Sequence, residues 1–181
     1  MSYTNKILVI DLEATCWQGA IPHNQRSEII EIGVCLLDTE TGAITANKGI
    51  LVQPEVSEVS KFCMELTTIT QTLLDKEGIS FTEACNQLVE TYNPYQLTWE
   101  SYGDYDRKMI QLECKHKSVD YPFSQDHINV KELFARLKNG GKKVGMNGAL
   151  QLLSIALEGT HHRGVDDAKN IAKILYRCLS D

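Results

Sequence analysis

The sequence predicts an α/β protein in which a mixed five-stranded sheet carries helices on both faces. Three strand-like segments come first, the hydrophobic period then changes from two to about 3.6 residues, and the remaining segments alternate between helix and strand. We therefore expect three antiparallel strands at the start of the sheet, followed by two parallel strands.

The strands are indicated by runs of apolar and β-branched residues. Residues 6–12 (KILVIDL) are almost continuously apolar, which is typical of a strand that is covered on both faces. Residues 28–37 and 43–52 are two more strands, joined by the turn DTETG. The fourth and fifth strand candidates are residues 96–102 and 127–130.

The helices are indicated by apolar residues three or four positions apart. The clearest stripe runs from Phe81 to Tyr92, and Ser80 with Glu83 makes a capping box at its start. A further helix begins at about Asp104. The other expected stripes are Leu133, Phe134 and Leu137, which end at Gly140-Gly141; Ala149, Leu152, Leu153, Ala156 and Leu157; and Ala168, Ile171, Ala172, Leu175 and Leu179.

Length and composition fit one globular domain, and we expect it to span residues 1–181. The net charge of −6 argues against a protein that binds nucleic acid by bulk electrostatic attraction. Six scattered cysteines without a CxxC pair indicate buried thiols in a reducing compartment. Because the sequence also shows no signal peptide and no apolar run of about 20 residues, we expect a cytoplasmic protein without a membrane partner.

Two carboxylates stand at the end of the first strand. Asp11 and Glu13 are two positions apart, so in a strand their side chains share one face. Unpaired charge is costly on a central strand, and a divalent cation would resolve that conflict. Alternatively, the strand ends at Ile10 and both acids lie in a solvated loop.

Helical phase separates the members of two further acid pairs. In the last helix Asp167 is in line with the buried stripe, whereas Asp166 leads to Asn170, Lys173 and Arg177 on the exposed face. In the earlier helix Asp106 is in line with Met109 and Ile110, and Asp104 is the expected N-cap. Asp106 and Asp167 are therefore the inward acids, although acids in a first turn also stabilise a helix simply by complementing its dipole.

Two histidines precede the last helix. A histidine beside a cluster of acids is a natural general base, because its ordinary pKa of about 6.5 lets it accept a proton near neutral pH. Tandem histidines in a loop are also common as exposed polar residues, and neither phase nor spacing chooses between His161 and His162.

These residues resemble the DEDDh family of 3′–5′ exonucleases, which have a ribonuclease-H-like fold. The resemblance rests on Asp11-x-Glu13, Asp106, and His162 five residues before Asp167. It also rests on the strings DLEATCW, FCMELTTITQ, GDYDRKMI and HRGVDDAKNIAKIL, which are similar to the branch with Eri-type histone-mRNA exonucleases and KapD-like sporulation-pathway inhibitors. The family register selects His162 over His161.

The resemblance implies phosphodiester hydrolysis with two divalent ions, Mg²⁺ or Mn²⁺. Asp11, Glu13, Asp106 and Asp167 would hold these ions, and His162 would take the proton of the attacking water. The resemblance also implies that Leu66 and Tyr105 sandwich the terminal base, that Phe62 supports this pocket, and that Glu13 and the backbone near Ala14 contact the 3′-OH. For Phe62 and Leu66 the alternative is ordinary core packing.

The expected substrate is a single-stranded 3′ end, with RNA favoured over DNA, and the expected product is a nucleoside 5′-monophosphate. One alternative is a ribonuclease-H-like endonuclease that cuts RNA in hybrids. Another is a non-catalytic regulatory scaffold of the same fold. A scaffold has no need to keep like charges buried together. The sequence identifies no protein partner.

Overall fold

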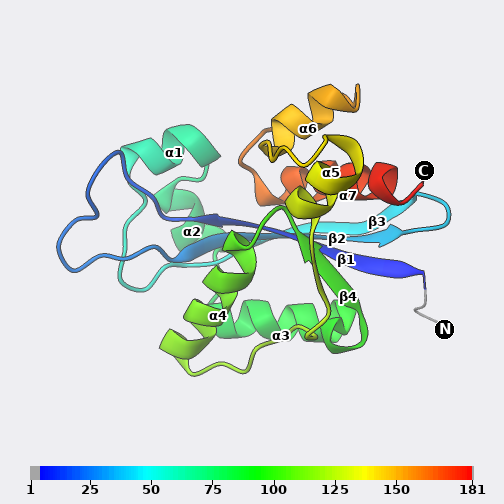
Figure 1. Cartoon of the computed structure of the whole chain (residues 1–181). Helices are drawn as coiled ribbons and strands as arrows, with labels where there is room; N and C mark the ends of the chain where they lie inside the picture. Colours follow the sequence, from blue (N-terminus) through cyan, green and yellow to red (C-terminus); the bar gives the residue numbers. More distant parts are fainter. Residues whose placement is uncertain (1–4, 181) are drawn as a thin grey trace.

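Figure 1 shows the computed structural model, in which a central sheet lies between helices. The structure describes residues 5–180, so the ends of the expected domain, residues 1–4 and 181, lie outside this range. In the described range the sheet has five strands in the order β3-β2-β1-β4-β5. Their bounds are Lys6–Ala14 (β1), Ile29–Asp38 (β2), Ile44–Leu51 (β3), Thr98–Ser101 (β4) and His127–Asn129 (β5).

The strand directions confirm the expected mixed sheet. β1 pairs antiparallel with β2, and β2 pairs antiparallel with β3. β4 runs parallel to β1, and β5 runs parallel to β4. The central position of β1 explains why its residues are apolar on both sides, since each face of the sheet is covered by helices.

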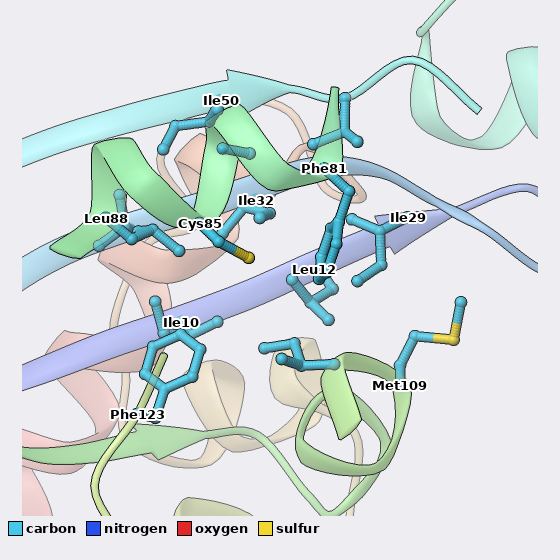
Figure 2. Close-up of a cluster of buried hydrophobic side chains, with 14 of the residues drawn as sticks. Ile10, Leu12, Ile29, Ile32, Ile50, Phe81, Cys85, Leu88, Met109 and Phe123 are labelled. Carbon is cyan, nitrogen blue, oxygen red and sulfur yellow. The ribbon is translucent and has the colours of Figure 1, made fainter. Parts of the chain in front are cut away.

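Two layers of helices bury the two faces of β1. Leu8, Ile10 and Leu12 belong to the cluster shared with α3 (Phe81–Tyr92) and α4 (Tyr105–Lys117), part of which is drawn in Figure 2. Val9 belongs to the opposite cluster, shared with three other helices. These are α5 (Val130–Lys138), α6 (Met146–Leu152) and α7 (Gly164–Leu179). None of the helices within residues 5–180 combines the length and the apolar character needed to cross a membrane.

Two short helices that the sequence pattern did not indicate stand near the carboxyl end of β1 (Figure 1). They are α1 (Lys61–Thr67) and α2 (Gln71–Glu77), and a 3-10 turn, η1 (Pro94–Gln96), precedes β4. The Cys63 thiol of α1 donates to the carbonyl oxygen of Ala14 at 3.6 Å, which ties α1 to the end of β1. Each helix has seven residues, too few for an amphipathic period to be visible.

The capping box of α3 is confirmed, whereas the helix expected over residues 149–157 is wrong in its extent. Glu83 N–H donates to Ser80 Oγ at 3.2 Å, and Ser80 N–H donates back to Glu83 Oε2 at 3.0 Å. α6 instead ends at Leu152, because Ser154 has φ +54° and the Ile155 N–H returns to the Leu150 carbonyl at 2.9 Å. That Schellman-type termination leaves residues 153–163 as a loop.

Four side chains within helices lie on the opposite side from the expectation. Leu152 and Leu179, each the last residue of its helix (α6 and α7), belong to the expected inward stripes but are 59% and 45% exposed. Leu137 falls in the last turn of α5 and is 49% exposed, so the inward stripe of that helix is carried by Val130 and Phe134. Asn170 is fully buried. Its amide donates to the Glu158 carbonyl at 2.9 Å and accepts from the Glu158 N–H at 3.0 Å, which fastens the loop before α7 onto that helix.

A pair of glycines lets α7 lie directly on the sheet. Gly33 on β2 is the register partner of Asp11, and a Cβ atom at Gly33 would lie 1.8 Å from the carbonyl oxygen of Gly164. A Cβ atom at Gly164 would lie 3.2 Å from the Asp11 carbonyl oxygen. This close approach places the first turn of α7 beside the carboxyl end of β1.

Candidate active site

Asp11 and Glu13 belong to β1, which continues to Ala14. The alternative in which the strand ends at Ile10 is therefore excluded. Asp11 is half-buried and Glu13 is buried, and both lie on the face of the sheet that α7 covers. The strand consequently holds two like charges side by side at the place where α7 begins.

Asp106 reaches the same place from α4. It lies in the first turn, is buried, and accepts a hydrogen bond from the backbone N–H of Leu12 at 3.0 Å. Met109 and Ile110 are buried with it, as helical phase predicted. Asp104 occupies the N-cap position but makes no capping hydrogen bond, because its Oδ1 atom accepts from Arg107 at 2.8 Å.

Asp167 is held by the loop that precedes α7. Its Oδ2 atom accepts from the backbone N–H of His162 and from the ring Nδ1 of His161, both at 2.9 Å. Its Oδ1 atom is buried and has no hydrogen-bond partner within residues 5–180. Since an unpartnered buried carboxylate oxygen is costly, this atom is available to a cation.

Burial and mutual repulsion raise the pKa values of these acids. Burial is the largest cause for Asp11, whose pKa lies well above its usual range, and the neighbouring charges of Asp106 and Glu13 add to it. Burial, followed by the charge of Asp167, raises the pKa of Glu13 to about 8. Burial raises the pKa of Asp106 to about 6, opposed by the Leu12 N–H. Such a cluster is stabilised by a bound cation.

Ligand atoms of Asp11, Glu13 and Asp167 lie within 4.8 Å of one another. The same distance limit holds for a second group of three residues, His161, His162 and Asp167. Asp106 belongs to neither group, but it lines the same pocket of about 320 Å³.

Burial, and next the nearby charge of His161, lowers the pKa of His162 below its ordinary value. A lowered pKa favours the neutral ring, the state that a general base requires.

Three of the four residues expected to contact the nucleotide line this pocket: Ala14, Leu66 and Tyr105. Tyr105 is 56% exposed, and Leu66 is half-buried, so neither is a core residue. Phe62 is not among the lining residues and is 37% exposed, which excludes ordinary core packing for it as well. Its supporting role stays a prediction.

Sequence reasoning missed Glu31, a buried acid beside the site. This residue interrupts the apolar run of β2 and pairs in register with Glu13. Its carboxylate accepts from Arg163 Nε and Nη2, both at 3.1 Å, and from the Gly164 N–H at 2.8 Å. Like Asp11, Glu31 is an acid within a buried strand, and this pattern is visible in the sequence. Tyr102 and Met146, which also line the pocket, carried no comparable signal.

We expect Glu31→Ala to destabilise the protein by about 3 kcal/mol, the low end of the cost of breaking a buried ion pair, because Arg163 keeps some contact with water. The turn that holds His162 would lose its anchor, so activity is expected to fall as well. Urea denaturation measures the first effect. Lys61→Ala, which removes an exposed pair with Glu65, should change stability by less than about 0.5 kcal/mol and is the matched control. Equal stability of the two variants would contradict a stabilising role for the ion pair between Glu31 and Arg163.

Comparison with known proteins identifies the family. The profile of the family described as Exonuclease (RNase_T) matches residues 8–175. The nuclease domain of 3′hExo, described as a DEDDh family member bound to rAMP, superposes with a TM-score of 0.86 and 31% identity, covering 99% of this chain and 94% of that one. This chain belongs to the DEDDh exonuclease family.

Two other relatives show what share of a longer protein this chain matches. The 3′-5′ exoribonuclease 1 of Rattus norvegicus is 34% identical over 99% of this chain and 54% of its own length. A 3′-exonuclease solved in 3′-end-specific recognition of a histone mRNA stem-loop has a TM-score of 0.84 and 30% identity, covering 100% of this chain and 84% of that one. The chain thus spans about half the length of this curated relative.

Proposed function

We propose that this chain is a metal-dependent 3′–5′ exonuclease that releases nucleoside 5′-monophosphates from single-stranded 3′ ends, with RNA preferred over DNA. The observation that carries the proposal is the convergence of Asp11, Glu13 and Asp167, whose ligand atoms lie within 4.8 Å of one another, in a pocket of nucleotide size that His162 also lines. Family membership and the names of the relatives support it.

The residues fit a pair of divalent ions of the hard, oxygen-preferring kind, Mg²⁺ or Mn²⁺. All the donors at the strand end are carboxylate oxygens, their pKa values are raised by burial and mutual repulsion, and the Oδ1 atom of Asp167 has no other partner in the described chain. Asp11, Glu13, Asp106 and Asp167 would hold the ions. When bound, the ions supply positive charge to the reacting phosphate and to the departing 3′ oxygen.

The chain's own groups perform the remaining tasks. Burial lowers the pKa of His162, which favours the neutral ring that can accept the proton of the attacking water. Leu66 and Tyr105 offer apolar surface to the terminal base, and stacking without base-edge hydrogen bonds tolerates any sequence. A pocket of about 320 Å³ lies at the small end of the ligand-site range of roughly 300–1,000 Å³, which suits one nucleotide.

We expect Tyr105→Ala to lower kcat/KM on single-stranded RNA by about 10- to 100-fold, because base stacking on an aromatic ring contributes roughly 1–3 kcal/mol. Tyr105→Phe keeps the ring and is the matched control, with activity close to that of the unmodified protein. Initial rates over a range of RNA concentrations measure the effect. If kcat/KM of Tyr105→Ala is within twofold of that of Tyr105→Phe, Tyr105 does not stack on the terminal base.

The test of the proposed function is a digestion series with matched single-stranded RNA and DNA in Mg²⁺, in Mn²⁺ and in chelator. We expect 5′-monophosphates as products, faster release from RNA, and no release in chelator. An RNA–DNA hybrid is digested in parallel, and cleavage confined to that hybrid would favour the endonuclease. Intact substrates under every condition would favour the scaffold.

A further inference from the structure

His161 touches two residues of the candidate site, although the proposed chemistry assigns it no task. It lies in the loop before α7 and lines the pocket. Its ring Nδ1 atom is 2.9 Å from Asp167 Oδ2, and its ring stacks on the ring of His162 with centroids 3.9 Å apart and an interplanar angle of 20°.

The contact with Asp167 fixes the orientation of the Asp167 carboxylate. The ring of His161 and the backbone N–H of His162 both donate to the Oδ2 atom, so this oxygen has two partners. The Oδ1 atom has none within the described residues, although it is buried. A carboxylate can only accept, so the proton of the contact must sit on His161 Nδ1. The two donors therefore leave one oxygen free for the cluster with Asp11 and Glu13.

The contact with His162 supports a strained residue. His162 has φ +65°, a left-handed conformation that non-glycine residues adopt at a cost. Among the ring contacts within residues 5–180, the ring of His162 stacks only on that of His161. Removing that neighbour would free the ring to rotate away from the pocket.

We propose that His161 is a positioning residue that orients the carboxylate of Asp167 through its Nδ1–H group and the ring of His162 through stacking. The inference rests on the proposed function, since it assigns His161 to the support of the same site. The two contacts use different parts of the side chain, so substitutions can separate them.

The experiment compares His161→Asn, which keeps an N–H donor near the Nδ1 position without a ring, with His161→Phe, which keeps a ring without a donor. Binding of Mn²⁺ in the absence of nucleic acid is followed by electron paramagnetic resonance. Steady-state kinetics on single-stranded RNA give kcat and KM separately. His116→Asn, the same change at an exposed position of α4, is the matched control.

We expect His161→Phe to weaken Mn²⁺ binding about tenfold, the lower end of the effect of removing a partner of a metal ligand. We expect His161→Asn to bind Mn²⁺ within about twofold of the unmodified protein, as His116→Asn does, but to lower kcat about tenfold at unchanged KM, a loss of roughly 1.4 kcal/mol in transition-state stabilisation. Weaker Mn²⁺ binding in one variant and a lower kcat with normal Mn²⁺ binding in the other would not both arise from a general loss of folding.

The proposal is overturned if both variants match His116→Asn in both readouts, or if both lose Mn²⁺ affinity and kcat equally. It is also overturned if His161→Asn is inactive while His162→Asn retains activity, because His161 would then be the base itself. If the unmodified protein degrades no nucleic acid, the proposed function fails. The Mn²⁺ titrations of the two variants still decide whether His161 orients Asp167.

Discussion

Asp11→Asn is expected to lower kcat on single-stranded RNA by at least about 10⁴-fold, which corresponds to roughly 5.5 kcal/mol of transition-state stabilisation. Asp11 stands at the centre of the acid cluster, close to both Glu13 and Asp167. An amide has nearly the same shape but neither the charge nor the affinity of a carboxylate for a hard cation. The variant should therefore fold and yet fail to turn over.

The stability of Asp11→Asn makes the loss of activity interpretable. Burial and neighbouring acids raise the pKa of Asp11 well above its usual range, so its charged form is unfavourable in the metal-free protein. Neutralising it should raise the Tm measured in chelator while it abolishes activity. Asp104→Asn, which removes the charge of a partly exposed pair with Arg107, is the control and should leave the rate unchanged. More than a tenth of the normal rate in Asp11→Asn would contradict the assigned role.

Divalent ions are expected to stabilise the protein, and to do so more strongly at pH 8 than at pH 5. The folded-state pKa of Glu13 is raised from 4.5 to about 8 and that of Asp106 from 3.8 to about 6. The folded protein thus keeps protons that the unfolded chain releases, and this contribution is present at low pH and lost as pH rises through the folded-state values. In chelator, Tm should fall between about pH 4 and pH 8.

Mg²⁺ or Mn²⁺ would replace those protons. At one hundred times Kd, binding contributes about 2.7 kcal/mol, which raises the Tm of a chain of this size by roughly 5–10 °C. Thermal denaturation at several pH values, with and without the ion, measures this. Glu13→Gln is the informative variant, because it should flatten the upper part of the pH dependence. A chelator-treated protein whose Tm rises from pH 5 to pH 8 would contradict the account.

Much of the fold could be predicted because its elements carry local signals. The apolar run of β1, the capping box of α3 and the stripes of α4 and α7 each reflect burial of one element against its neighbours. The short helices α1 and α2 carry too few residues for a period. The end of α6 depends on a left-handed conformation at Ser154, and the burial of Asn170 depends on a partner twelve residues away, neither of which a helical stripe reveals.

In the candidate site, too, local patterns predict some features, whereas others depend on contacts between distant parts of the sequence. Strand alternation and helical phase place Asp11, Glu13, Asp106 and Asp167 on inward faces, where the structure has them lining one pocket. The contact of Glu31 with Arg163 comes from the pairing of β1 with β2 and from the close approach of α7, so it spans 132 positions of the sequence. A local pattern carries no information on such a contact, and the same holds for the hydrogen bond between Leu12 and Asp106.

Digestion of a 5′-labelled single-stranded RNA with the unmodified protein in Mg²⁺, with the products resolved by length, tests whether the acid cluster removes nucleotides from a 3′ end. We expect a ladder that shortens by one nucleotide at a time from the 3′ end, release of 5′-monophosphates, and no products either in chelator or with Asp11→Asn. Internal fragments without a ladder, or a ladder that persists in chelator, would contradict this expectation.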